Sequence, residues 1–171
     1  MKLYSGRIPS ISSEIVRSLT DGGEIEVVSA PEVELDVASV LKEYLRVDRE
    51  LTDRAKDMME QRHLPYAQFA RLKRELAEQM DFGLGDEALN WICTQLFETF
   101  MHSANVDEVF ADDATFRRRV KDILRKHMAL EEEMDAEVRG RIKNLSEGTA
   151  AWEHEYTRVL EQIRKKHGVQ Q

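Results

Sequence analysis

The sequence is poor in residues that interrupt helices or cross-link a chain. Its 171 residues include eight glycines, three prolines and one cysteine. So few glycines and prolines favour long helices over many short strands. A single cysteine excludes an intramolecular disulfide and a thiolate zinc cluster. Because Cys93 stands inside the apolar run 89–93, we predict that it is a buried small side chain rather than a nucleophile.

Long apolar runs and a basic region are also missing. No run approaches the roughly 18 apolar residues of a membrane span, and the first residues lack the apolar core of a signal peptide. We therefore expect a cytoplasmic protein without a membrane partner. Residues 1–80 carry 12 Lys and Arg against 15 Asp and Glu, and residues 81–171 carry 13 against 18. Two acidic halves argue against a strongly basic, non-specific nucleic-acid-binding domain.

The two halves of the chain resemble each other at an offset of 83 positions. The matching apolar residues recur at three- and four-residue steps, which is helical periodicity, so the repeat preserves a buried stripe. The clearest matches are Val37 with Val120, Leu41 with Leu124, Leu51 with Met134, and Ala55 with Val138.

Each half predicts the same order of elements: a helix, a polar turn, a short alternating piece, a long helix and a return helix. The predicted helices are 10–20, 32–62 and 66–80, then 86–103, 113–145 and 149–167. The alternating pieces 24–28 and 105–110 leave room for one very short strand per unit, and the two strands could pair. Ser29 with Glu32 predicts a capping box, and Asp112 or Asp113 predicts a cap for the second long helix.

These patterns predict an all-α, pseudo-two-fold bundle made of a tandem repeat of a helix–loop–helical-hairpin unit. The first unit covers residues 1–80 and the second covers residues 81–171, with Gly83 and Gly85 at the boundary. Periodicity leaves two arrangements open, because the units can pack side by side or intertwine.

The sequence also resembles a known family. The second unit contains SEGTAAWEHEY at 146–156, and the first contains EVELDV at 32–37 leading into VLKEYL at 40–45. Together with the length, these segments resemble the bacterial family catalogued as domain of unknown function 507, over the whole chain. The shared motifs are turn and core residues, so the resemblance implies a helical fold and carries over no activity, cofactor or site residue.

Catalytic and metal-binding patterns are weak. His127 with Glu131, and Glu98 with His102, lie four apart and could each place two ligands on one helix face. A helical di-iron site needs paired Glu-x-x-His motifs, and none occurs. The chain also lacks a nucleophile elbow and a glycine-rich phosphate loop. We predict no metal, no cofactor and no enzymatic activity.

Basic residues gather at the start of the second long helix. A solvated face is our preferred interpretation, since no aromatic residues interleave to stack on bases. The alternative is a nucleic-acid- or ribosome-associated accessory factor that uses this candidate basic patch. Its members are Arg117, Arg118, Lys121, Arg125 and Lys126.

Methionine and aromatic residues gather near the tip of the first hairpin. Met58, Met59, Tyr66 and Phe69 form either part of the core or an exposed docking patch. An acidic bundle with long helices offers grooves for helix docking. The leading hypothesis is a non-catalytic interaction or adaptor protein of the bacterial cytosol that binds another protein, and a homodimer is compatible with it. The sequence names neither the partner nor the pathway.

Overall fold

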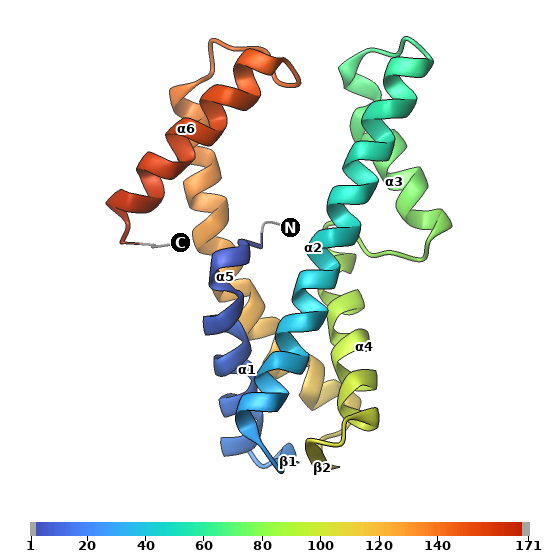
Figure 1. Cartoon of the computed structure of the whole chain (residues 1–171), viewed down its shortest axis with the longest axis vertical. Coiled ribbons are helices and arrows are strands. Elements are labelled where there is room, and N and C mark those ends of the chain that lie inside the picture. Colours follow the sequence, from blue (N-terminus) through green and yellow to red (C-terminus); the bar gives the residue numbers. More distant parts are fainter. Residues whose placement is uncertain (1–2, 169–171) are drawn as a thin grey trace.

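The computed structural model describes residues 3–168, and it is mostly helical with one small two-stranded sheet (Figure 1). A short 3₁₀ turn, Ser5–Arg7, precedes the first helix, and a second one, Tyr66–Gln68, precedes α3. The helices are α1 (Ile8–Asp21), α2 (Ala30–Gln61), α3 (Phe69–Gln79), α4 (Glu87–His102), α5 (Asp113–Arg141) and α6 (Ala150–Lys166). The strands are β1 (Ile25–Val27) and β2 (Val106–Val109).

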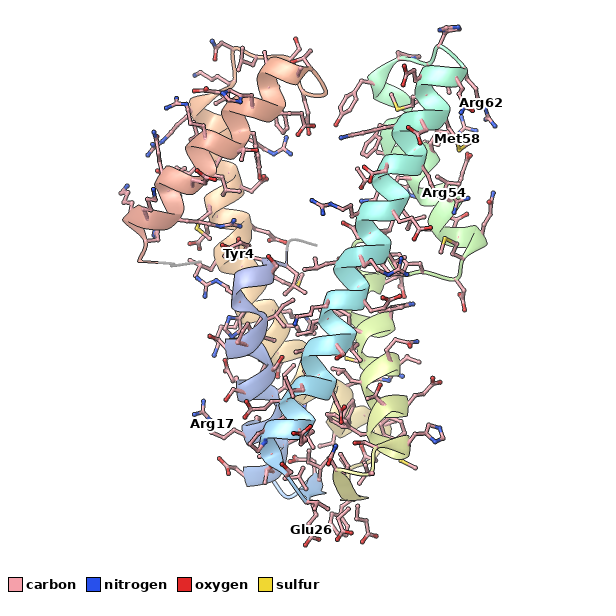
Figure 2. All side chains as sticks on the ribbon, in the orientation of Figure 1. Tyr4, Arg17, Glu26, Arg54, Met58 and Arg62 are labelled. Atoms are coloured by element: carbon pink, nitrogen blue, oxygen red, sulfur yellow. The ribbon has the colours of Figure 1, made fainter. Side chains whose placement is uncertain are left out.

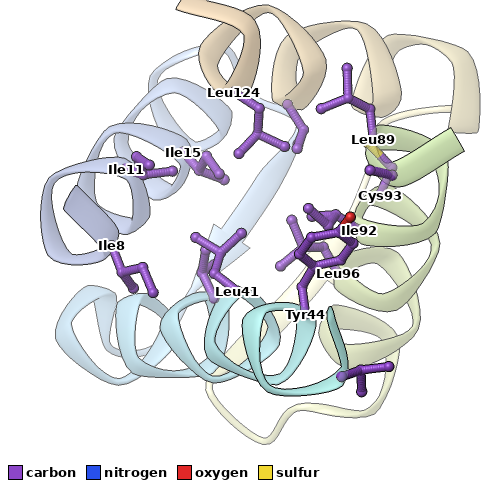
Figure 3. Close-up of a cluster of buried hydrophobic side chains, with 14 of the residues drawn as sticks. Ile8, Ile11, Ile15, Leu41, Tyr44, Leu89, Ile92, Cys93, Leu96 and Leu124 are labelled. Carbon is purple, nitrogen blue, oxygen red and sulfur yellow. The ribbon is translucent and has the colours of Figure 1, made fainter. Parts of the chain in front are cut away.

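Four helices form a common base. All of α1 and α4, and the first parts of α2 and α5, pack around one core (Figure 3). Apolar residues at helical spacing supply it, as with Ile8, Ile11 and Ile15 on α1, each at most 1% exposed. Cys93 is fully buried in this core, as predicted. Helices from residues 1–80 and from residues 81–171 therefore share one interior.

The short alternating pieces do pair. β1 and β2 run antiparallel, with Ile25 opposite Val109, Glu26 opposite Glu108, and an irregularity before the Val27–Val106 pair. Ile25 and Val106 point into the base, while Glu26 and Glu108 are exposed, as alternation requires. This β-ribbon closes one end of the base (Figure 1).

The long helices α2 and α5 continue beyond the base and diverge, and each is covered by its return helix (Figure 1). We call the hairpin of α2 and α3 the first arm and the hairpin of α5 and α6 the second arm. The described segment ahead of α1, beginning at Leu3, lies between them (Figure 1). The molecule is therefore a two-armed body with the β-ribbon at the end opposite the arm tips.

The helix ends agree with the predicted ones within a few residues, and two details differ. Ser29 stands at the N-cap of α2, but its side chain makes no capping bond, so the predicted capping box is wrong. Pro31 at the start of α2 has no N–H group, which removes one of the donors that a cap would satisfy. At α5 the carboxylate of Asp112 accepts from the backbone nitrogen of Thr115 at 2.7 Å, which is the expected cap.

The second long helix also ends earlier than predicted. α5 stops at Arg141 rather than near residue 145, and Ile142 begins a turn in which Leu145 donates to the carbonyl of Ile142. Ile142 is 2% exposed, so the chain keeps it in the core of the second arm after the helix has ended. Because Ile142 stays buried, the apolar pattern in the sequence continues beyond the last residue of the helix, and the predicted end was too late.

Candidate interaction surfaces

A cleft of about 920 Å³ lies between the two arms. The first arm contributes Leu45 and Phe69 to its wall, the second contributes Tyr156 and Leu160, and Leu3 lies there from the N-terminal segment. All five side chains are half-buried rather than fully packed. Apolar surface from both arms therefore faces one common space.

Charged groups of both signs rim the apolar walls. Lys73, Arg74 and Arg164 line the cleft together with Asp48 and Glu131. A cleft of this size with mixed charges and partly exposed apolar walls suits a segment of a protein chain that carries side chains of several kinds.

A buried carboxylate holds the second arm to the base. Glu131 on α5 is 5% exposed and accepts from Arg7 at 3.1 Å and from Arg164 of α6 at 2.9 Å. The guanidinium of Arg164 also stacks over the ring of Tyr4, 3.3 Å from its centroid. The N-terminal segment, α5 and α6 thus meet at a single charge, and we call this group of four residues the Glu131 junction.

The first arm is held by rings instead. Tyr44 on α2 stacks on Phe82 with centroids 4.8 Å apart, and Trp91 of α4 meets both rings edge-on. The Tyr44 hydroxyl donates to the carbonyl of Gly83 at 3.2 Å. A Cβ at Gly83 would lie 2.3 Å from the carbonyl oxygen of Glu87, so this close approach requires glycine.

The two arm tips also touch. The Cβ that any other residue would add at Gly148, which has a φ of +89°, would fall 2.5 Å from the ring of Tyr66. Nearby, Lys56 of the first arm pairs with Glu153 of the second at 3.7 Å. The cleft is therefore bounded at both ends, by the base and by the tips.

The structure divides the candidate basic patch among different neighbours. Arg117 binds Asp113 and reaches the carbonyl of Asn90 and the hydroxyl of Thr94, both on α4. Lys121 also binds the Asn90 side chain.

The remaining patch residues face elsewhere. Lys126 pairs with Glu14 of α1, on another side of α5. Arg118 and Arg125 stay exposed, and Arg125 lies 3.7 Å from Asp122. The five residues therefore do not form one free cationic surface.

The candidate docking patch is likewise divided. Met59 is 9% exposed and belongs to the core, which rules it out as part of an exposed surface. Met58 and Phe69 are half-buried against the same core. Tyr66 is 38% exposed and stacks on Phe69, with ring centroids 5.5 Å apart. Of the four, Phe69 lines the cleft and Tyr66 contacts the other arm.

The His127–Glu131 pair, considered as a source of metal ligands, is separated by its contacts. His127 meets Glu14 at 2.8 Å, while Glu131 is taken up by the two arginines of its junction. Within residues 3–168 no three His, Cys, Asp or Glu side chains come together in a metal-binding arrangement. Burial raises the pKa of the Cys93 thiol to about 11, which keeps it protonated near neutral pH and a poor nucleophile.

A shared base, a β-ribbon and two arms around a cleft define a small, two-armed helical bundle. Residues 1–169 match the family described as "Protein of unknown function (DUF507)", and the chain belongs to that family. A search of curated proteins gave no match. Within the described residues, no helix combines the length and apolar character needed to cross a bilayer. The resemblance drawn from segments 32–45 and 146–156 is thus confirmed.

Sequence reasoning missed the cleft and the Glu131 junction. Leu45 and Leu160 lie at helical spacing with the other apolar residues of their helices. Periodicity does not distinguish a side chain in a core from one at a cleft. Glu131 had a usable signal, because it interrupts the apolar stripe of α5 between Met128 and Met134.

Proposed function

We propose that this protein is a non-catalytic helical interaction or adaptor protein, and that it holds a segment of a partner protein in the cleft between its arms. The supporting observation is that half-buried apolar side chains from both arms face this cleft without meeting across it. Leu45 and Phe69 pack against the core of the base and first arm, while Tyr156 and Leu160 pack against a separate core in the second arm. A helix or turn with apolar side chains on two sides would join these surfaces.

We also propose that the chain is a tandem duplication of one unit, residues 1–80 and 81–171, with pseudo-two-fold symmetry. Each half runs helix, strand, long helix, return helix among the described elements. The clearest residue pairs matched at the 83-position offset are buried in both copies. They are Val37 and Val120, Leu41 and Leu124, Leu51 and Met134, and Ala55 and Val138. A duplicated hairpin supplies two similar walls for one cleft.

The same proposal places the protein in the bacterial cytoplasm. The buried Cys93 is a free thiol, which fits a reducing compartment. Size measurement by light scattering on the purified protein settles whether the working form is a monomer or a homodimer.

The test is a pull-down from the native lysate with and without nuclease, read by mass spectrometry. Ala70 is exposed and lines the cleft, so Ala70→Arg fills the cleft without removing a core side chain. Ala136 is exposed on α5 and does not line the cleft, so Ala136→Arg is the matched control. We expect a small protein set that survives nuclease, persists with Ala136→Arg and disappears with Ala70→Arg. Retention of that set by Ala70→Arg would reject the cleft as its binding site.

The alternative function is a nucleic-acid- or ribosome-associated accessory factor. Its supporting observation is that Arg118 and Arg125 remain exposed on α5. Under this alternative, the captured set would disappear with nuclease, and Arg118→Glu with Arg125→Glu would abolish retention on a nucleic-acid column at low salt. Unchanged retention of the double variant would exclude this surface.

A further inference from the structure

The β-ribbon end of the molecule has no covering element. β1 and β2 form the extremity opposite the arms, and Glu26 points away from the bundle there (Figures 1 and 2). Among the described residues no third strand joins the pair, so its outer edges are unpaired. The exposure of Glu26 and Glu108 shows that one face of the ribbon is open to solvent.

This end carries negative charge without any Lys or Arg in the segments that build it. No Lys or Arg occurs from residue 18 to residue 41, a stretch that holds six Asp and Glu. Residues 98–116 likewise hold five Asp and Glu and no Lys or Arg. The rest of the chain is close to balanced, so the net negative charge of the sequence comes from these two segments.

Some of these carboxylates have internal structural roles. Glu24 pairs with Arg119, Asp36 accepts from the hydroxyl of Ser103 at 2.8 Å, and Asp113 pairs with Arg117 at 2.8 Å. Those residues stabilise the fold and are not available to a partner.

Three others have no such role. The side chains of Glu26, Asp107 and Glu108 are exposed and make no hydrogen bond or ion pair within residues 3–168. Moreover, Glu26 lies directly opposite Glu108 in the ribbon. Like charges at directly opposed positions destabilise a strand pair, so this arrangement costs stability and contributes nothing to the fold.

Apolar side chains flank the acidic pair. Val28 directly follows β1 and is 70% exposed, and Phe110 directly follows β2 and is 57% exposed. Because the backbone of Val28 donates to Asn105 and that of Phe110 to Glu24, the two lie at opposite ends of the ribbon. Four residues of strand separate them, which is about 13 Å.

We propose that the outer face of the β-ribbon binds an extended, basic segment of a partner protein. In an extended segment the side chains at positions one, three and five share a face and span about 13 Å. A segment with apolar residues at the first and fifth positions and Arg or Lys at the third would place its apolar side chains on Val28 and Phe110. Its cation would then lie between Glu26 and Glu108 and neutralise their repulsion.

The charge of the ribbon selects this class of partner. Nucleic acid and anionic membrane surfaces are polyanions and would be repelled. A second copy would bring a second acidic ribbon against the first, which is equally unfavourable. A cationic protein segment is favoured because its positive charge complements Glu26 and Glu108 and the spacing of its apolar residues matches that of Val28 and Phe110.

This inference rests on the proposed interaction role and concerns a second surface, remote from the cleft. The probe is a synthetic peptide, GSVTRTVGS, titrated into the ¹⁵N-labelled full chain and followed by amide shifts. The control peptide, GSVTETVGS, replaces its one cation by an anion. We expect shifts confined to residues 24–29 and 104–111, and binding at least tenfold weaker for the control peptide.

Variants of the protein sharpen this test. Glu26→Lys should weaken binding of the GSVTRTVGS peptide at least tenfold. It should also raise the Tm of the protein, because it converts a repulsive cross-strand pair into an attractive one. Phe110→Ser should weaken binding of the GSVTRTVGS peptide at low and at high salt alike. Glu132→Lys with Glu133→Lys, both exposed on α5, is the charge control and should bind as the native chain does.

The proposal is overturned if the peptide produces no shifts at millimolar concentration. It is also overturned if both peptides bind alike, or if the α5 charge control loses binding as strongly as Glu26→Lys. None of these outcomes bears on the cleft proposal, because Glu26→Lys leaves the cleft intact. Likewise, Ala70→Arg tests the cleft and leaves the ribbon intact.

Discussion

The two arms are built from matching apolar stripes, yet they join the base in different ways. In the first arm, Leu51 and Met59 belong to the same core as the base, so the interior runs without a break along α2. In the second arm, Met134 and Val138 belong to a separate core, and the base core ends at Met128. Glu131 lies at the break between them.

Both long helices carry a carboxylate at matching positions, so the arms differ in how deeply that charge is buried and not in where it lies along the helix. At the matching position of the first unit, Asp48 pairs with Lys73 at 2.7 Å, but this carboxylate is at the rim, where 35% of its side chain is exposed. The first arm is therefore an extension of the base. The second arm is a small unit of its own, which apolar packing and the Glu131 junction hold in place.

The largest expected effect comes from Glu131→Ala. Removing this carboxylate leaves the largely buried Arg7 and Arg164 without their counter-charge, which typically costs about 3–5 kcal/mol. Hydrogen exchange should accelerate across residues 134–163 while residues 47–76 stay protected. The paired variant Asp48→Ala should cost about 1 kcal/mol or less, because it breaks a rim ion pair. Equal losses from the two variants would show that the arms are attached alike.

The second prediction compares the two cores at matched positions. Leu51 and Met134 are both buried, and truncating either one to alanine should cost about 2–5 kcal/mol. Trp91 lies at the base and Trp152 lies in the second arm, so single-tryptophan variants report the two regions separately in denaturant. Leu51→Ala should shift the Trp91 transition, and Met134→Ala mainly the Trp152 transition. Coincident shifts of both signals would mean one cooperative unit.

The third prediction tests the ring contacts of the first arm. Tyr44→Phe keeps the stacking on Phe82 and removes the hydroxyl that donates to Gly83, so we expect a loss of about 1 kcal/mol. This loss is measured by comparing the denaturation of the protein with and without Tyr44→Phe, both in the Trp152→Phe background. A loss several times larger would show that the hydroxyl, rather than the rings, fixes the first arm.

The smallest effect is a pH dependence at the base. Burial raises the pKa of Glu14, but the hydrogen bonds from Lys126 and His127 outweigh it and leave the pKa below its usual value. The contribution of Glu14 to stability is therefore complete above pH 4.5 and is lost as the pH falls through the lowered pKa. Glu14→Gln should flatten the acid limb of the Tm profile. An acid limb equally steep in the variant would assign that loss to other carboxylates.

Most of the fold was predictable because it depends on local periodicity. The six helices and both short strands appear close to where the apolar spacing placed them. The capping box at Ser29 failed although Ser29 stands at the N-cap, because spacing along the sequence does not fix where its hydroxyl points. The predicted end of α5 was wrong because Ile142 stays buried beyond the last residue of the helix.

The candidate surfaces were less predictable because their geometry depends on distant residues. Arg117 is taken up by α4 and Lys126 by α1, across 27 and 112 positions of sequence, so a cluster that is dense in the sequence is divided in space. Phe69 and Leu160 come together at the cleft only through the angle between the arms. The spacing of residues along one helix carries no information about that angle.

The contact between Tyr66 and Gly148 gives the molecule the outline of a closed ring. The base, the arms and the touching tips bound the cleft in which we propose that a partner segment binds. A partner with a free end can thread through it, whereas an internal segment of a folded partner enters only after the tips separate. If a partner binds in the cleft as we propose, its association through such a segment would be limited by the rate at which Tyr66 and Lys56 release the second arm. Once the tips close again, the same ring slows its escape.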